Sequence, residues 1–243
     1  MAVKILAVDT SEKSASIALL DSERVVAEAS AFSGGANAVV HSVWLMPNIH
    51  ALLKEHGVSV KNIDIFAVVN GPGSFTGLRI GISAVKGMAW ALDKRVFGVS
   101  SLSALALNAR LSKMPVCALI DAHKGEVYAA LYSFEGESVV RLIDSAAFLP
   151  CDLIAALQAK LGKEGQAVFL GSGLIKHSEE IKNSFKGAII APEDDWRIKA
   201  ECVGRIALKM FLSGEEPTDV LGLKPLYLRR PEGDYKPLTK IIT

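Results

Sequence analysis

The stretch KILAVDTSEKSASIALL, residues 4–20, decides the fold expected for this chain. It reads as a short apolar strand that ends at Asp9, followed by a polar turn and a second strand. Residues 115–134, PVCALIDAHKGEVYAALYSF, repeat this order, with Asp121 at the end of the first apolar run. Because the second copy starts close to the middle of the chain, the sequence predicts an internal duplication.

The rest of each half alternates between strands and helices. Residues 63–73 read as a buried strand leading into a glycine-rich loop, and residues 95–111 as a strand followed by a helix. The other expected helices cover residues 36–56, 76–93, 152–161 and 198–212. Pro47 should kink or divide the first of these four helices.

This order of elements favours an α/β protein with the duplicated actin-like ATPase (ASKHA) fold. In that architecture a nucleotide lies between two similar half-domains, and each Asp-bearing turn faces its phosphates. We expect an N-terminal half-domain with interface helices at residues 1–98 and a C-terminal half-domain at residues 99–228. Residues 229–243 read as a loose tail.

The composition is that of a globular protein and excludes several functions. Half of the 243 residues are apolar and the net charge is +1, so unaided binding to nucleic acid, which usually requires a basic excess, is not expected. No apolar run approaches the roughly 18 residues of a membrane span. The first residues show no charged leader or cleavage site. We therefore expect a cytoplasmic protein without membrane contact.

The glycine-rich loop NGPGSFTGLRIG, residues 70–81, does not have the spacing of a phosphate-binding motif. It lacks the Lys of a P-loop, and its third glycine comes one residue too late for a dinucleotide fingerprint. In the helix that follows, small residues form a stripe that includes Gly77, Gly81 and Ala84, with Met88 among them. Since glycine inside a helix costs about 1 kcal/mol relative to alanine, we expect this stripe to contact another helix.

The helical segment before that loop carries no charged residue between positions 29 and 53. A helix that is apolar nearly all round is buried on both sides. We expect the two helices to dock as a pair onto a second subunit; the alternative is a fully internal helix of a monomeric core. The interface residues expected on this first helix are Val39, His41, Val43, Trp44 and Met46, and His41 can be a hydrogen-bonded interface or core residue.

Candidate residues for chemistry are few. No two histidines are three or four positions apart, so no helical pair can hold a metal, and no catalytic residue is assigned. Asp9 and Asp121 are the best candidates for contacts with magnesium-bound water, although an Asp that caps a turn is an equally good interpretation. Gly171 and Gly173, in a short motif after a strand, could pass under an adenine.

Several motifs together resemble the TsaB family of bacterial proteins, which are required for threonylcarbamoyladenosine in tRNA. The motifs are ILAVDTS, NGPGSFTGLRIG, KGMAWAL, DAHKGEVYAALY and PLYLRRP, and the resemblance covers nearly the whole chain. It implies an actin-like ATPase fold and a cytoplasmic location. It also implies pairing with TsaD and the ATPase TsaE, which together transfer a threonylcarbamoyl group to the adenosine next to the anticodon.

The chain lacks the H-x-x-x-H metal motif of TsaD, so it resembles the non-catalytic partner. The resemblance implies a helix bundle with TsaD or, in isolation, a homodimer, and contact with tRNA only through the complex. Asp9, Thr10 and Ser11 match the phosphate-like turn of the family, which either binds ATP or ADP or only preserves the fold. His123 replaces the family's usual Arg, which puts an anion contact there in doubt.

Two hypotheses follow from the sequence. The first is a scaffold subunit that activates TsaD through the helices at residues 36–56 and 76–93 and requires no cofactor. The second is an ATPase or phosphotransferase that uses Asp9 and Asp121 across the cleft between the halves. A peptidase has the least support, because the chain lacks a metal pair or a catalytic triad.

Overall fold

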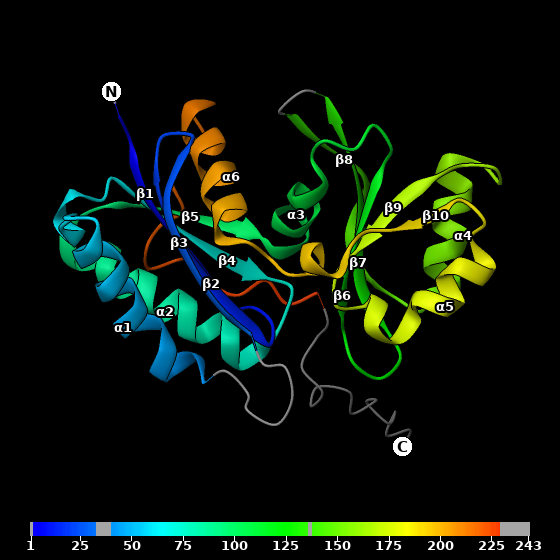
Figure 1. Ribbon diagram of the computed structural model, residues 1–243, viewed down its shortest axis with the longest axis horizontal. Helices are drawn as coiled ribbons and strands as arrows, with labels where there is room; N and C mark the ends of the chain where they lie inside the picture. Colours follow the sequence, from blue (N-terminus) through cyan, green and yellow to red (C-terminus); the bar gives the residue numbers. More distant parts are fainter. Residues whose placement is uncertain (1, 33–39, 136–137, 229–243) are drawn as a thin grey trace, which may run out of the picture.

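A computed structural model describes residues 2–32, 40–135 and 138–228 of the chain (Figure 1). Its first sheet has the strand order β3-β2-β1-β4-β5, in which β1 is antiparallel to β2 and parallel to β4. The strands are β1 (Lys4–Asp9), β2 (Ser14–Asp21), β3 (Arg24–Phe32), β4 (Ile65–Gly71) and β5 (Arg95–Ser100). In the register of β1 and β2, Asp9 lies opposite Ser16, so the turn between these strands lies beyond the C-terminal end of β1.

The second sheet repeats this plan, with the order β8-β7-β6-β9-β10. Its strands are β6 (Val116–Asp121), β7 (Val127–Glu135), β8 (Ser138–Phe148), β9 (Ala167–Leu170) and β10 (Ala188–Ile190). The third strand of each half, β3 or β8, lies at one edge of its sheet. The first strand, β1 or β6, pairs with the second and the fourth strand of its half. The predicted duplication and the actin-like ATPase fold are therefore confirmed.

Helices connect and cover the strands. They are α1 (His41–Glu55), α2 (Phe75–Leu92), α3 (Ser101–Ala106), α4 (Pro150–Leu161), α5 (Leu174–Ser184) and α6 (Ala200–Leu212), with short 3-10 turns η1 (Val60–Asn62), η2 (Leu107–Ala109) and η3 (Glu193–Trp196). The sequence did not lead us to expect α5, β8 or β10. In α5 only Leu174 and Ile181 are buried, so the apolar pattern that marks a helix is faint there.

Helix α1 runs without interruption through Pro47, so of the two effects expected of this proline, division of the helix is wrong and a kink stays a prediction. Proline removes one backbone donor from the helix interior. The side-chain amide of Asn48, the next residue, donates to the carbonyl of Trp44 over 2.7 Å, and the helix continues for two further turns, to Glu55.

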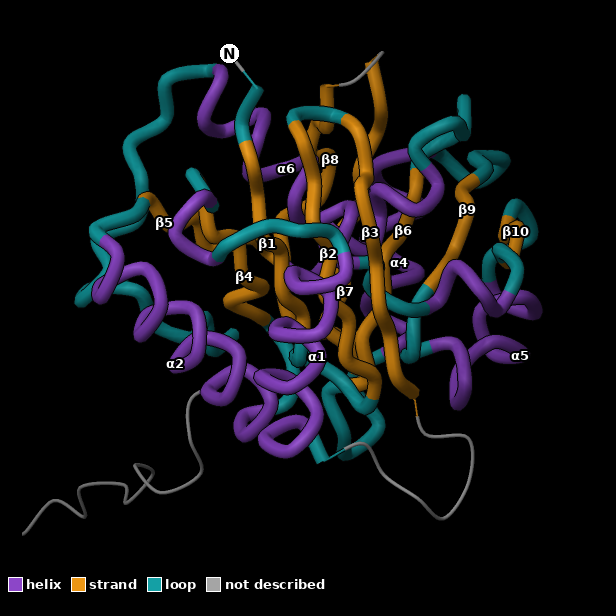
Figure 2. The backbone as a smooth tube through the Cα atoms, turned by 60° about the vertical axis from the view of Figure 1, so that its left-hand side comes forward, coloured by secondary structure: helices purple, strands orange, loops and turns teal. Residues whose placement is uncertain are grey.

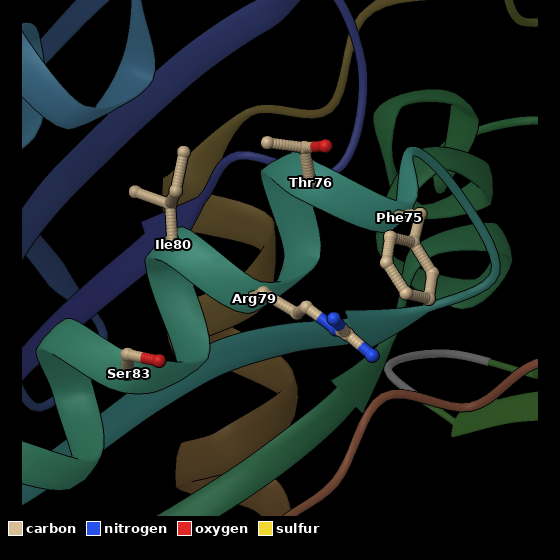
Figure 3. A pocket seen from close by; sticks show the side chains of 5 residues that line it. All are labelled: Phe75, Thr76, Arg79, Ile80 and Ser83. Carbon is tan, nitrogen blue, oxygen red and sulfur yellow. The ribbon is translucent and has the colours of Figure 1, made fainter.

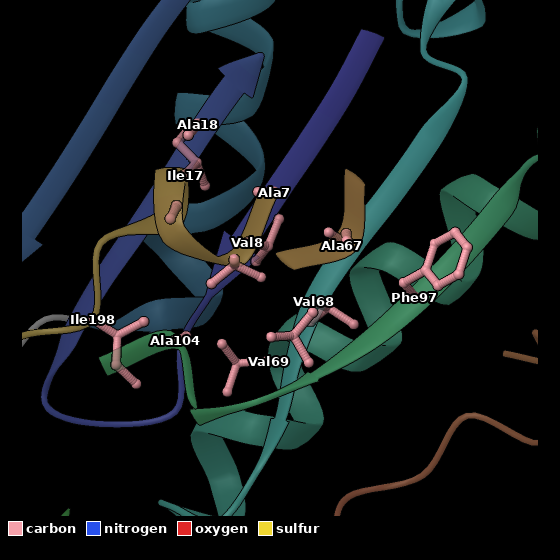
Figure 4. Packing of buried hydrophobic residues seen from close by; sticks show 14 of the residues in the cluster. Ala7, Val8, Ile17, Ala18, Ala67, Val68, Val69, Phe97, Ala104 and Ile198 are labelled. Carbon is pink, nitrogen blue, oxygen red and sulfur yellow. The ribbon is translucent and has the colours of Figure 1, made fainter. Parts of the chain in front are cut away.

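The first sheet lies between two layers of helices. Helices α1 and α2 lie side by side against one face, and α6 lies against the other (Figures 1 and 2). Figure 4 shows side chains of β1, β2 and β4 packed together with Ile198, which precedes α6. Helix α6 therefore returns to the first sheet, although the expected C-terminal half-domain included residues 200–228.

Residues 215–228, which we call the C-terminal strap, also return to the first half. The amide of Thr218 donates to Val96 in β5 over 2.8 Å, and the amide of Leu226 donates to Asn70 over 2.6 Å. The predicted tail at residues 229–243 lies outside the described residues. None of the helices in the described ranges has the length and apolar character of a membrane span.

The strand-to-helix turn expected in the glycine-rich loop is confirmed. Strand β4 ends at Gly71, and α2 begins at Phe75 after the N-cap Ser74, whose hydroxyl accepts the amide of Gly77 over 3.2 Å. Such a cap satisfies one of the free donors at a helix start. The loop therefore connects the C-terminal end of β4 to the start of α2.

Candidate functional site

The turn after β1, residues 9–12, is the polar centre of the first half. Asp9 is completely buried, and one carboxylate oxygen accepts the amide of Ser11 over 2.9 Å and its hydroxyl over 2.6 Å. The other oxygen, Oδ2, has no hydrogen-bond partner among the described residues. Asp9 therefore caps the turn, as one interpretation of the sequence held, while half of its carboxylate is left unpaired.

The start of α2 clamps this turn. The hydroxyl of Thr10 donates to the carbonyl of Gly77 over 2.7 Å, and the amide of Ser74 donates to the carbonyl of Ser11 over 2.6 Å. A Cβ atom at Gly77 or at Gly81 would overlap Thr10. The prediction that these two glycines contact a partner helix is therefore wrong. They are small because α2 crosses the turn of its own chain at close range.

The turn after β6 is built differently. Asp121 accepts the amide of His123 over 2.9 Å and forms an ion pair with Lys176 over 2.7 Å. Burial by itself would raise the pKa of Asp121, but the Lys176 ammonium and the His123 amide outweigh that effect and hold the pKa below its ordinary value. His123, at the position of the family's Arg, and Lys124 both adopt left-handed backbone conformations, with φ of 61° and 52°. The imidazole Nδ1 of His123 lies 3.7 Å from the Asp121 carboxylate.

Ser172 joins the two turns across the halves. Its hydroxyl donates to the carboxylate of Glu12 and accepts the amide of Asp121 over 3.2 Å. Sequence reasoning missed both Glu12 and Ser172, because one lies in a polar turn and the other between two glycines. Only their proximity in space, 160 positions apart in the chain, reveals the contact.

The two carboxylates of the first turn hold protons more tightly than usual. Burial raises the pKa of Asp9 to about 6, against the lowering effect of its hydrogen bonds with Ser11. Burial, together with the negative charges of Asp9 and Asp121, raises the pKa of Glu12 to about 7, against the lowering effect of its hydrogen bond with Ser172. At neutral pH the carboxyl group of Glu12, which contacts Ser172 across the halves, is therefore partly protonated.

Gly171 and Gly173 flank Ser172 and pack against β6. A Cβ atom at Gly171 would overlap the carbonyl of Leu119, and one at Gly173 would lie 3.0 Å from the Leu119 side chain. Gly171 also has a φ of 119°, a conformation that favours glycine. Packing accounts for both glycines, and an adenine contact at them stays a prediction.

Helix α1 presents an apolar face to solvent. It buries one side, including Leu45 and Ile49, against the first sheet. On the opposite side Val43 is 69% exposed and Met46 is 47% exposed, and the N-cap residue Val40 is 58% exposed. The alternative of a fully internal helix is therefore wrong. We call Val40, Val43 and Met46 the exposed face of α1.

The other expected interface residues are less accessible. Trp44, Ala84 and Met88 are half-buried and pack against the core of the first half. His41 is also half-buried, and its Nε2 lies 2.9 Å from the carbonyl of Glu12. Val39 lies outside the described residues. The N-termini of both helices thus touch the turn that follows β1.

Two of the best-defined hollows of the described surface lie away from the two turns. One, of about 360 Å³, lies on the outer side of α2 (Figure 3). Its lining residues are Phe75, Thr76, Arg79, Ile80 and Ser83. The other, of about 260 Å³, lies between β3 and α1. Within the described ranges, no group of three or more His, Cys, Asp or Glu side chains is arranged to hold a metal ion.

Comparisons with known proteins found a matching family model, similar sequences and similar solved structures. The family model of TsaD, tRNA N6-adenosine threonylcarbamoyltransferase, matches residues 36–193. The tRNA threonylcarbamoyladenosine biosynthesis protein TsaB of Bacillus subtilis (strain 168) is 32% identical over 96% of this chain and 96% of its own length. The protein of the same name from Escherichia coli (strain K12) is 30% identical over 93% and 95%. The solved structure of YeaZ from Pseudomonas aeruginosa is 28% identical, with a TM-score of 0.78 over 93% of this chain and 100% of that one.

Proposed function

The chain belongs to the TsaB family of tRNA threonylcarbamoyladenosine biosynthesis proteins, and we propose that it acts in that modification as a non-catalytic subunit that pairs with TsaD and TsaE. In this role it works in the cytoplasm and reaches tRNA only through the complex. The chain activates TsaD by binding it, and a second copy can occupy the same surface when TsaD is missing.

One observation carries the proposal, the exposed face of α1. Burying a Val or Met side chain contributes roughly 1.5–3 kcal/mol, and α1 leaves Val43 and Met46 largely in water. The same helix has no charged residue until its last turn. A helix side of this composition is typical of a surface that another protein covers.

The contacts between the two turns support the non-catalytic part of the proposal. The Glu12 carboxylate contacts the Ser172 hydroxyl directly, and α2 holds the Asp9 turn from the other side. A nucleotide phosphate would have to displace the contact between Glu12 and Ser172 before it could lie between the turns.

Reconstitution tests this function. TsaD, TsaE, ATP, a threonylcarbamoyl donor and tRNA are mixed with or without the chain, and the modified adenosine is measured by mass spectrometry. We expect modification with the wild-type chain and little with the double variant Val43→Asp, Met46→Asp. Leu149→Asp is the matched control, because Leu149 is as exposed as Met46, at 47%, but belongs to the second half. Equal modification without the chain would contradict the proposal.

The second candidate is nucleotide binding between Asp9 and Asp121, with ATP or ADP as the ligand. It is favoured by the unpaired Oδ2 atom of Asp9, a buried oxygen that could accept a hydrogen bond from magnesium-bound water. Calorimetry of the isolated chain with ATP and magnesium separates the candidates. Micromolar binding that Asp9→Ala abolishes would support a nucleotide site, whereas the scaffold role requires no such binding.

A further inference from the structure

Arg79 is an exposed cation at the hollow on α2. Among the residues that the structure describes, it forms no ion pair with a carboxylate. Its guanidinium lies 3.6 Å from the centre of the Phe75 ring (Figure 3). Its Nε donates to the hydroxyl of Tyr227 in the C-terminal strap over 3.3 Å.

These neighbours hold the guanidinium in place before any partner binds. The rings of Phe75 and Tyr227 are stacked with their centres 5.4 Å apart, and Arg79 contacts both residues. A guanidinium that stacks on an aromatic ring keeps its planar fork available for two parallel hydrogen bonds to a carboxylate. The entropy cost of ordering a long side chain is thus largely met before association.

Acidic residues are nearly absent from the two helices α1 and α2. Residues 65–92, which include all of α2, contain no Asp or Glu, and residues 29–53 contain no charged residue of either sign. The only acidic residue of α1 is Glu55, at its last position. Among the described residues, the exposed surface of these two helices is therefore largely apolar, and the positive charge of Arg79 has no carboxylate partner.

We propose that the hollow on α2 receives an Asp or Glu side chain of a different protein chain docked on α1 and α2, with Arg79 as its ion-pair partner. This inference rests on the proposed function, because it assumes that the helix pair is the docking surface. It adds the chemistry of the partner: an apolar surface that carries a carboxylate opposite Arg79.

The same argument predicts that Arg79 favours binding of a different protein over binding of a second copy of this chain. A second copy that docks through its own α1 and α2 offers no acidic residue before Glu55, so it brings Arg79 against an apolar or cationic surface. Burying a charge without a partner is costly, and juxtaposed like charges suppress wrong partners. Arg79 therefore favours the heteromeric complex over self-association.

The test compares Arg79→Gln with Lys113→Gln, since each removes one positive charge from an exposed side chain. Lys113 is exposed and lies in the loop that leads into β6, not on α2. Binding of each full-length variant to TsaD is measured by calorimetry at low and at high salt. Self-association of each variant is measured by sedimentation equilibrium. Circular dichroism checks that both variants are folded, as expected for exposed positions.

We expect Arg79→Gln to weaken TsaD binding at least about tenfold at low salt, the scale of an interface arginine. It should also flatten the salt dependence, while self-association stays unchanged or becomes tighter. Lys113→Gln should bind TsaD like the wild type. Wild-type affinity of Arg79→Gln, or an equal weakening of self-association, would overturn the inference.

These outcomes are distinct from a failure of the proposed function. If the wild-type chain does not bind TsaD at all, the function itself is wrong. If the wild-type chain binds and Arg79→Gln binds equally well, the pairing stands and only the carboxylate contact is wrong.

Discussion

At the scale of single residues, the four residues of the turn after β1 form contacts within the turn, with α2 and with the second half. Asp9 caps the turn, Thr10 and Ser11 hold the start of α2, and Glu12 reaches Ser172 in the second half. Side chains here are therefore constrained by tertiary contacts that local sequence preference does not reveal.

Glu12 should make the stability of the protein depend on pH. Its pKa is raised from 4.5 to about 7 in the folded chain, so the folded state binds more protons than the unfolded state between these values. The free energy of unfolding should then fall as pH rises from about 4.5 to about 7. Urea unfolding at pH 4.5, 6 and 8 measures this, and Glu12→Gln should show a smaller fall than the wild type. Identical pH profiles of the two proteins would show that Glu12 has an ordinary pKa.

Gly77 and Gly87 form a matched pair on α2. A Cβ atom at Gly77 would overlap the backbone of Thr10, whereas one at Gly87 would meet nothing within 4 Å. We expect Gly77→Ala to destabilise the chain by on the order of 1–3 kcal/mol through overpacking. Gly87→Ala should stabilise it by about 0.5–1 kcal/mol, because alanine favours the helix. Thermal unfolding of both variants checks the prediction, and equal effects would contradict the clamp between α2 and the turn.

At the scale of elements, α1 and α2 each have one side that packs on the sheet and one side that is exposed, and the sequence alone did not distinguish the two sides. One side of each helix packs on the first sheet, and the other side faces solvent with apolar or cationic side chains. The C-terminal strap contacts α2, because the ammonium group of Lys86 donates a hydrogen bond to the carbonyl of Leu221 over 2.9 Å. The surface proposed for docking thus depends on a segment from the end of the chain.

The strap should contribute to stability through one buried side chain. Leu223 is 2% exposed and belongs to the core of the first half, whereas Leu221 is 70% exposed. We expect Leu223→Ala to lower the free energy of unfolding by about 2–5 kcal/mol, the usual cost of a core cavity. Leu221→Ala should change it by no more than about 0.5 kcal/mol. Chemical denaturation of both variants measures the difference, and similar values would mean that the strap is not packed on the core.

At the scale of the whole molecule, the largest hydrophobic cluster extends across both halves. The largest buried cluster contains residues of β1 and β4 together with Ala118 of β6 and Tyr132 of β7. Helix α6 packs on the first sheet after the chain has completed the second. The halves are therefore similar in topology but not independent in packing.

A shared core predicts a single cooperative unfolding transition. Unfolding followed by circular dichroism and by tryptophan fluorescence should have coincident midpoints, because Trp44 and Trp90 lie in the first half and Trp196 packs against both hydrophobic clusters. Ser172→Ala, which removes the contact with Glu12, should shift both signals together. Two separate midpoints would show that the halves unfold independently.

The sequence by itself determined the duplicated strand plan, the helices α1 and α2, and the family. These follow from apolar periodicity and from motifs such as the Asp-bearing turns at Asp9 and Asp121, all of which are local. The tertiary structure decided what lies opposite each surface: Gly77 faces Thr10 of the same chain, Glu12 faces Ser172, and α6 returns to the first sheet. Periodicity shows which side of an element avoids water, but not which distant segment covers it. The glycines Gly77 and Gly81 of NGPGSFTGLRIG therefore serve an internal contact, which local sequence did not predict, and its exposed Arg79 is the residue that we propose to contact a partner.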